Sequence, residues 1–222
     1  MDVRTQMRRA AGFFADHEAV VHGDFRLTFD AAWRRGIRFG NGLIAMGVKP
    51  GDRVAVLEDN CIEAADFYLG VANANAVRVP LYPRNGREAH LHMVGHTGCR
   101  FLVVQDKYAH EVEGLEDDLP DLERIFVRDS SYEEWLATQS DVDPDLPISE
   151  DDLYILRHTG GTTGPSKGVA YTHGMWLDVG RNWFYTFPPV EIGDKCLHMG
   201  PISHGSGYFF GPTWLGGGVS PR

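Results

Sequence analysis

The chain has 222 residues, of which 43% are apolar and 23% charged, and its formal net charge at pH 7 is −10. This composition is that of a globular protein, and a chain of this length buries roughly 70% of its unfolded surface. The negative charge and the absence of a lysine- and arginine-rich stripe exclude a nucleic-acid partner, because phosphate backbones are bound by clustered positive charge.

Strand-like and helical segments alternate from residue 28 to residue 127. Thr28 can cap a helix whose apolar positions recur at helical spacing until Gly47 ends it. Further helical segments are predicted at 62–72, 88–97 and 108–118. A continuous apolar run of the buried-strand type stands at 54–57, and the segments 77–79, 101–104 and 125–127 are also predicted to be strands. The repeat of strand, helix and strand predicts the α/β fold class, with a mainly parallel sheet covered by helices on both faces.

An acidic stretch with two prolines divides the chain. Residues 141–151 hold Pro144 and Pro147 among acidic side chains, which is typical of a linker. We therefore expect a first α/β subdomain over residues 1–140. We expect residues 152–222 to carry a glycine-rich loop and to begin a second subdomain.

The cysteines lie far apart in apolar surroundings, at Cys61, Cys99 and Cys196. They indicate neither a disulfide framework nor a zinc knuckle, so we expect no metal site and a reducing, cytoplasmic setting. No apolar run approaches the ~18 residues that a membrane span needs, and the run at 10–15 is too short for a signal peptide. The sequence therefore predicts no transmembrane segment.

Three histidines lie close together in the predicted helix 88–97. His92 and His96 are one helical turn apart and His90 is nearby, which raises the hypothesis of a zinc site. No carboxylate or thiolate completes such a site. We interpret these histidines as part of a solvated helix face.

Residues 159–168 form a loop rich in glycine and threonine between the strand-like runs 153–156 and 169–172. Its glycines let backbone N–H groups turn toward an anion, and its hydroxyls and one lysine add further donors. The residues that we expect to bind phosphate are Thr159, Gly160, Gly161, Thr162, Thr163, Gly164, Ser166, Lys167 and Gly168. This set predicts a site for a polyphosphate.

The spacing within the loop excludes two nucleotide motifs and leaves a third motif open. The P-loop requires glycine directly before its lysine and a hydroxyl directly after it, whereas Ser166 and Gly168 flank Lys167. The glycine intervals also fail the dinucleotide fingerprint. Residues 164–168 do match the G-x-S-x-G pattern of serine hydrolases, but a predicted strand and not a helix follows. A hydrolase with Ser166 as its nucleophile is therefore the less favoured alternative.

Residues 153–173, LYILRHTGGTTGPSKGVAYTH, resemble the signature of the adenylate-forming superfamily, which includes acyl-CoA and aryl-CoA synthetases. Residues 51–60, 76–83 and 200–207 are similar to other segments of that family, in the same order. The signature departs from the usual one at three positions. His158 replaces an aromatic residue, Gly160 replaces a serine and Ser166 replaces a proline.

The resemblance implies an ATP-dependent acid-thiol ligase. Such an enzyme activates a small carboxylic acid as acyl-AMP and transfers the acyl group to a thiol, usually that of coenzyme A, with ATP and Mg²⁺ as reactants. It implies that the loop holds the pyrophosphate part of ATP, and that Lys167 and His204 are catalytic. The candidates for an acyl pocket are Trp183, Gly207, Tyr208 and Phe209.

The family's later motifs have no counterpart in this chain. We therefore expect the N-terminal portion of a longer enzyme, truncated at 216–222 and unable to complete the reaction by itself. An exposed sheet edge and exposed apolar surface would favour a homo-oligomer or other self-association. A non-catalytic phosphate-binding or assembly module is the second alternative function.

Overall fold

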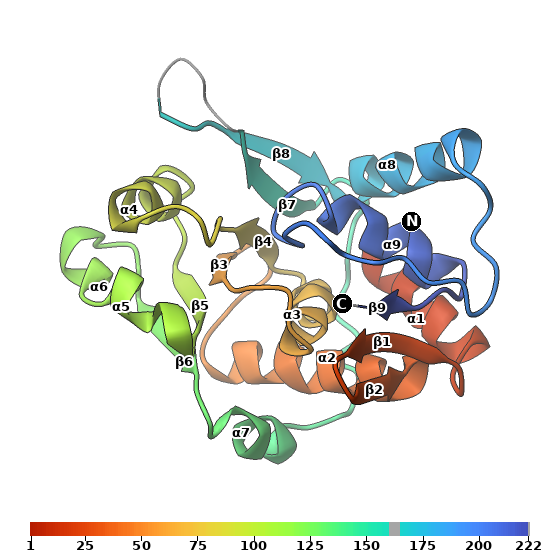
Figure 1. The fold of residues 1–222 in the computed structure, drawn as a ribbon. Coiled ribbons are helices and arrows are strands. Elements are labelled where there is room, and N and C mark those ends of the chain that lie inside the picture. The colour runs from red at the N-terminus through yellow and green to blue at the C-terminus, as the bar shows by residue number, and fades with distance from the viewer. Residues whose placement is uncertain (160–164, 222) are drawn as a thin grey trace.

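The computed structural model describes residues 1–159 and 165–221, and a six-stranded sheet covered by helices forms its main part (Figure 1). The strand order is β6-β5-β3-β4-β7-β8. Neighbouring strands are parallel except β7 and β8, which are antiparallel. The strands are β3 (Arg53–Leu57), β4 (Val77–Pro80), β5 (Phe101–Gln105), β6 (Arg124–Arg128), β7 (Leu153–His158) and β8 (Gly168–Thr172). The predicted fold class and the predicted strands are confirmed.

Two layers of helices bury the two faces of this sheet. One face packs against α2 (Phe29–Ala45), α3 (Glu63–Asn73) and α7 (Tyr132–Thr138). The other packs against α4 (Arg87–His96), α5 (Ala109–Val112) and α6 (Leu115–Asp118), with a short 3₁₀ turn at Asp106–Tyr108. Side chains alternate along a strand, so Val54 and Val56 reach the first layer while Ala55 and Leu57 reach the second.

The helix predicted to begin at Thr28 is confirmed as α2. The Thr28 hydroxyl accepts a hydrogen bond from the Ala31 N–H at 3.2 Å, which satisfies one of the free donors at the helix start. The chain turns at Gly47, whose φ of +102° favours glycine. A Cβ on Gly36 would lie 2.5 Å from the Cβ of Leu69, so this glycine lets α2 and α3 approach closely.

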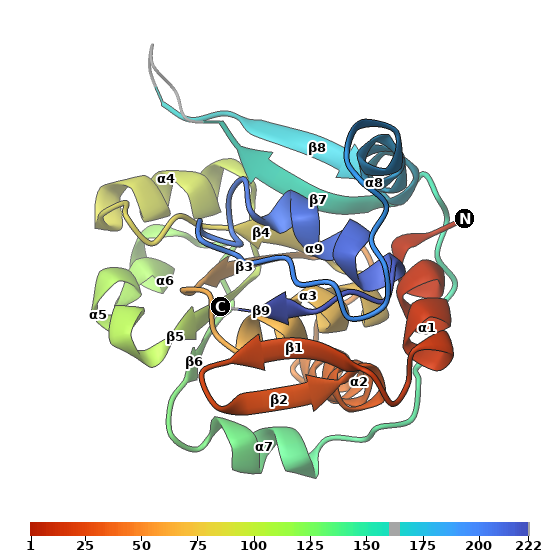
Figure 2. The same cartoon turned by 45° about the vertical axis from the view of Figure 1, so that its right-hand side comes forward.

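The N-terminal residues and the C-terminal residues form a second packing unit that the sequence analysis did not predict (Figure 2). It contains the helices α1 (Val3–Phe13), α8 (His173–Thr186) and α9 (Gly207–Leu215), and a small sheet of β2 (Phe25–Thr28), β1 (Glu18–His22) and β9 (Ser220–Pro221). The rings of Phe29 and Trp214 lie 4.5 Å apart at its centre. The Val3 N–H donates to Nδ1 of the buried His173 at 3.2 Å, which ties the start of α1 to the start of α8.

The acidic stretch 141–151 has no regular secondary structure and is held by α1. The Arg4 guanidinium donates to the Leu146 carbonyl at 2.8 Å and to the Asp145 carboxylate at 2.9 Å. Strands from both sides of this stretch pair in the same sheet, and its role as a linker between two subdomains stays a prediction. In the part of the chain that the structure describes, no helix has the length and hydropathy that crossing a bilayer needs.

Candidate functional site

The phosphate-loop candidate joins β7 to β8 at one edge of the sheet (Figure 1). Thr159 and Lys167 face each other where the two strands separate. The Thr159 N–H donates to the Lys167 carbonyl at 2.9 Å, and the Lys167 N–H lies 3.4 Å from the Thr159 hydroxyl oxygen. The hairpin therefore brings the first and last polar groups of the predicted site together. Its intervening candidates, Gly160, Gly161, Thr162, Thr163 and Gly164, lie outside the described residues.

Lys167 is exposed at the open end of this hairpin. Among residues 1–159 and 165–221, no carboxylate is in ion-pair contact with its ammonium group. Many other cations of the chain are paired, such as Arg100, which bonds Glu123 at 2.7 Å. A lysine held at a fixed place without an internal counterion is suited to an anionic ligand.

The serine-hydrolase alternative for Ser166 is wrong. A nucleophile elbow needs a helix directly after its serine, because the helix start helps to present the hydroxyl at the top of the sheet. Here the strand β8 begins at Gly168, two residues after Ser166, and pairs with β7 as a hairpin. Ser166 therefore belongs to a hairpin arm.

His204 lies near the same edge of the sheet, on the segment that precedes α9. Its ring is 4.9 Å from the ring of Tyr82, which follows β4, and the Tyr82 hydroxyl donates to the His158 carbonyl at the end of β7. Asn60, which follows β3, holds the segment through the Gly200 carbonyl at 2.8 Å. The residues at the carboxyl ends of β3, β4 and β7 thus contact His204, the segment that carries it, or each other. Open α/β sheets bind ligands at the carboxyl ends of their strands.

The four acyl-pocket candidates do not share one set of neighbours. Trp183 of α8 lies 5.1 Å from Phe209 of α9, whereas Tyr208 stacks on Trp176 at 5.1 Å. Gly207 is required by packing, because a Cβ there would overlap the Ile202 carbonyl oxygen. Whether these residues line an acyl pocket stays a prediction.

Two buried arginines close to the acyl-pocket candidates were not predicted from the sequence. Arg78 of β4 and Arg157 of β7 are 1% and 5% exposed, and the Nη1 of each has no hydrogen-bond partner in the described part of the chain. The Cζ of Arg157 lies 4.1 Å from the centroid of the Tyr208 ring, and the Cζ of Arg78 lies 4.4 Å from that of Tyr68. Burial lowers the pKa of Arg157, and the charge of Arg78 lowers it further. The sequence did contain a signal for them, because each of these charged residues lies inside an otherwise apolar strand segment.

The base of the hairpin holds a neutral imidazole. Burial, together with smaller contributions from the nearby His96 and His92, lowers the pKa of His158 to about 4. The protonated form is therefore rare at neutral pH, and the exposed positive charge at the base of this hairpin is that of Lys167.

The interpretation of the α4 histidines as a solvated face is wrong for two of them. His90 is fully buried, and Nε2 of the half-buried His92 lies 2.9 Å from the Ser166 carbonyl oxygen. The His92 ring also stacks on that of His96 at 5.4 Å. No group of three or more histidine, cysteine or acidic side chains among the described residues is arranged to hold a metal ion.

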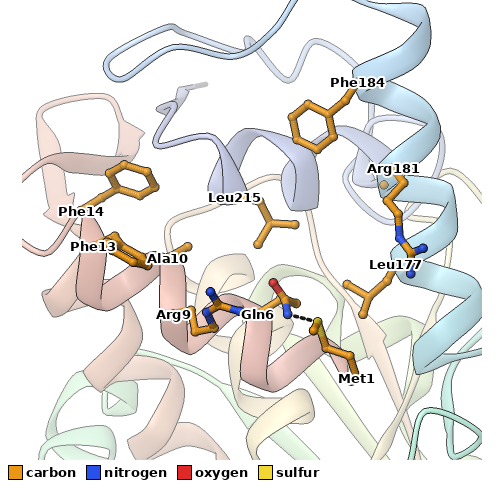
Figure 3. A pocket seen from close by; sticks show the side chains of 11 residues that line it. Met1, Gln6, Arg9, Ala10, Phe13, Phe14, Leu177, Arg181, Phe184 and Leu215 are labelled. Carbon is orange, nitrogen blue, oxygen red and sulfur yellow. Dashed lines mark hydrogen bonds between the residues drawn. The ribbon is translucent and has the colours of Figure 1, made fainter.

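A groove with a volume of about 660 Å³ lies between α1 and α8, with Leu215 of α9 at its floor (Figure 3). Phe13 and Phe14 stand at one end of it, and Phe184 faces them from α8. None of the predicted site residues that the structure describes lines this groove. It is therefore a different region from the β7–β8 hairpin.

The profile of the AMP-binding enzyme family matches residues 7–220, and the chain belongs to this family. A feruloyl-CoA synthase from Amycolatopsis sp is 33% identical over 205 residues, which are 90% of this chain and 40% of that protein. A 3-hydroxybenzoate–CoA ligase from Aromatoleum sp. is 30% identical over 209 residues, or 91% of this chain and 39% of that protein. The chain thus spans about 40% of the length of these curated relatives.

Solved structures show the same fold. The N-terminal domain of FACL13 from Mycobacterium tuberculosis superposes with a TM-score of 0.93 at 23% identity, over 100% of this chain and 57% of that one. ATP-bound MatB from Rhodopseudomonas palustris superposes with a TM-score of 0.86 at 21% identity, over 100% of this chain and 45% of that one. The expected likeness to the N-terminal domain of acyl-CoA synthetases is confirmed.

Proposed function

We propose that this chain forms the part of an ATP-dependent acid-thiol ligase that holds the phosphates of ATP. The observation that carries the proposal is the hydrogen bond between Thr159 and Lys167 at the open end of the β7–β8 hairpin, where Lys167 is exposed and has no ion pair among the described residues. Membership of the AMP-binding enzyme family and the printed names of the relatives as CoA synthases and CoA ligases support it.

The proposed reaction has two steps. A carboxylate oxygen attacks the α-phosphorus of ATP and displaces pyrophosphate, which gives an acyl adenylate. A thiol, which we propose to be that of coenzyme A, then attacks the acyl carbon and releases AMP. The first nucleophile is already an anion, so the protein needs to position it and to compensate charge, and no general base is required.

Several of the predicted site residues have a proposed part in the first step. Lys167 and the Thr159 hydroxyl would hold the β- and γ-phosphates together with the loop residues 160–164. Mg²⁺ bound to the same phosphates would neutralise further negative charge. His204 would contact the carboxylate and the adenylate, because it lies at the edge where the strands end. The acyl chain would lie against Gly207 and Tyr208 of α9.

Carboxylate-dependent exchange between ATP and pyrophosphate tests this proposal in the protein that carries the chain. We expect Lys167→Ala to lower the exchange rate by about 10²–10³, the usual cost of losing one group that stabilises developing charge. Lys49→Ala is the matched control, because Lys49 is exposed in the turn before β3. Equal rates in wild type and Lys167→Ala would refute the assignment. ATP binding without exchange would favour the non-catalytic phosphate-binding module.

We also propose that the chain self-associates. Phe13 is 77% exposed and Tyr185 is 88% exposed, and exposed aromatic surface favours contacts between copies. Light scattering over a range of concentrations should give the mass of a dimer or a larger assembly. The mass of a monomer at every concentration would contradict this proposal.

A further inference from the structure

The peptide unit between Ser166 and Lys167, in the phosphate-loop candidate, has a hydrogen-bond partner on each of its two sides. The carbonyl of Ser166 and the N–H of Lys167 belong to the same planar peptide. The carbonyl oxygen lies 2.9 Å from Nε2 of His92, and the N–H lies 3.4 Å from the hydroxyl oxygen of Thr159. Since a carbonyl oxygen only accepts, the His92 Nε2 carries the hydrogen in this contact. The plane of the peptide is therefore fixed by a donor on one side and an acceptor on the other.

The orientation of this peptide bears on the lysine. The peptide plane that precedes the Lys167 Cα, together with the φ of Lys167, sets the direction of its Cα–Cβ bond. Lys167 is exposed and has no ion pair in the described chain that could orient its ammonium group. The backbone contacts of Ser166 and Lys167 thus set the direction in which the Lys167 side chain starts from the backbone.

The contact from α4 has a counterpart on the other arm of the hairpin. The Tyr82 hydroxyl donates to the His158 carbonyl, on the strand that enters the loop, as His92 does on the arm that leaves it. The α4 helix is a firm support, because Met93 and Val94 are fully buried in the core beneath it. The His92 ring is further held by stacking on His96, with an angle of 16° between the ring planes. Both views of the fold show α4 next to the hairpin (Figures 1 and 2).

We propose that His92 is a positioning residue of the phosphate site. Its Nε2–H bond to the Ser166 carbonyl fixes the Ser166–Lys167 peptide and so directs Lys167 toward the phosphates of ATP. The inference rests on the proposed function for the role of Lys167, but the bond itself can be tested without any ligand.

Two substitutions separate the hydrogen bond from the shape of the ring. His92→Phe keeps a planar ring that can stack on His96 and removes the donor. His92→Gln keeps an N–H donor of similar reach and removes the ring. His96→Phe is the matched control, because it makes the same chemical change one helical turn away, at a ring without a hydrogen bond to the hairpin in the described chain.

Amide hydrogen exchange in the 222-residue chain is the first measurement. We expect His92→Phe to speed exchange in the hairpin arms, at Thr159 and at Lys167, by about fivefold to tenfold, which is the effect of losing one hydrogen bond. His92→Gln and His96→Phe should stay within about twofold of wild type, as expected when the bond is kept. Unchanged exchange in His92→Phe, or equal acceleration in all variants, would overturn the proposal.

Pyrophosphate exchange in the protein that carries the chain is the second measurement. We expect His92→Phe to raise the KM for ATP by about fivefold to tenfold while the KM for the acid stays unchanged. His92→Gln should restore the wild-type KM for ATP. A merely structural role would raise both KM values, or lower thermal stability alone, and would overturn the proposal.

The two measurements test different claims, so the proposed function and the role of His92 can be refuted independently. If the wild-type protein showed no carboxylate-dependent exchange, the proposed function would be wrong, and amide exchange would still decide whether His92 holds the hairpin. If His92→Phe did not fold, His92→Gln would decide, because a donor at this place should suffice for wild-type protection at Lys167. Loss of protection in His92→Gln would then count against the proposal.

Discussion

The guanidinium carbon of Arg157 lies 4.1 Å from the centre of the Tyr208 ring. This cation–π contact offsets part of the cost of burying the Arg157 charge. Within residues 1–159 and 165–221, the Arg157 Nη1 is buried without a hydrogen-bond partner. Arg128, which is also buried, pairs instead with the carboxylate of Glu58. Of these two buried arginines, Arg128 thus has a carboxylate counterion, and Arg157 has none among the described residues.

This difference predicts opposite effects of the same substitution. Arg157→Met should raise the free energy of unfolding by about 1–2 kcal/mol, because it removes a buried charge that has no counterion. Arg128→Met should lower it by about 3–5 kcal/mol, because it leaves the Glu58 carboxylate buried and unpaired. Urea denaturation measures both values. A similar loss of stability in both variants would contradict this account of Arg157.

The buried His158 predicts a loss of stability in acid. Its folded-state pKa is about 4, below the usual 6.5, because burial disfavours the charged ring. Between these two values the unfolded chain binds a proton that the folded chain does not, so the free energy of unfolding falls as the pH falls from 6.5 to 4. The full cost is roughly 3 kcal/mol, of which about 2 kcal/mol is reached by pH 5.

His158→Phe isolates this effect. Between pH 7 and pH 5 the variant should lose about 2 kcal/mol less stability than wild type, as measured by urea denaturation at each pH. The comparison of slopes removes contributions from other titrating groups, such as the buried Asp66, whose pKa of about 6 changes stability in the opposite direction. Parallel pH profiles for the two proteins would show that His158 is charged in the folded chain.

Two neighbouring glycines predict different tolerance at the start of α9. A Cβ on Gly207 would overlap the Ile202 carbonyl oxygen, whereas a Cβ on Gly205 meets nothing within 4 Å. Gly207→Ala should therefore lower the free energy of unfolding by more than about 2 kcal/mol, since backbone must move to make room. Gly205→Ala should change it by less than about 0.5 kcal/mol. Thermal melting of both variants checks this, and equal melting temperatures would contradict the packing role of Gly207.

Local patterns in the sequence were sufficient for the sheet and for α2. Apolar runs predicted β3, β5 and β6, and the two valines on either side of Arg78 predicted β4, because strands of a sheet covered on both faces are mostly apolar. A capping threonine and a glycine stop predicted α2, because both are local signals. The helix predicted at 108–118 is broken into short turns at Gly114, whose φ is +71°.

The second packing unit could not be predicted in the same way. Its contacts join residues far apart in the chain, such as Val3 with His173, and no local pattern encodes such a pair. The same holds at the candidate site, where Tyr82, His92 and His158 come together only because β4, α4 and β7 are neighbours in the fold. The sequence located Thr159 and Lys167 because both belong to one short motif.

The most direct test of the central claim, that the β7–β8 hairpin binds the β- and γ-phosphates of ATP, is a comparison of ATP with AMP. Equilibrium binding of each nucleotide to wild type and to Lys167→Ala is measured in the presence of Mg²⁺. We predict that Lys167→Ala weakens ATP binding by about tenfold to a hundredfold, the cost of one charge-assisted hydrogen bond, and leaves AMP binding unchanged. An equal loss for both nucleotides, or no loss for ATP, would contradict the account.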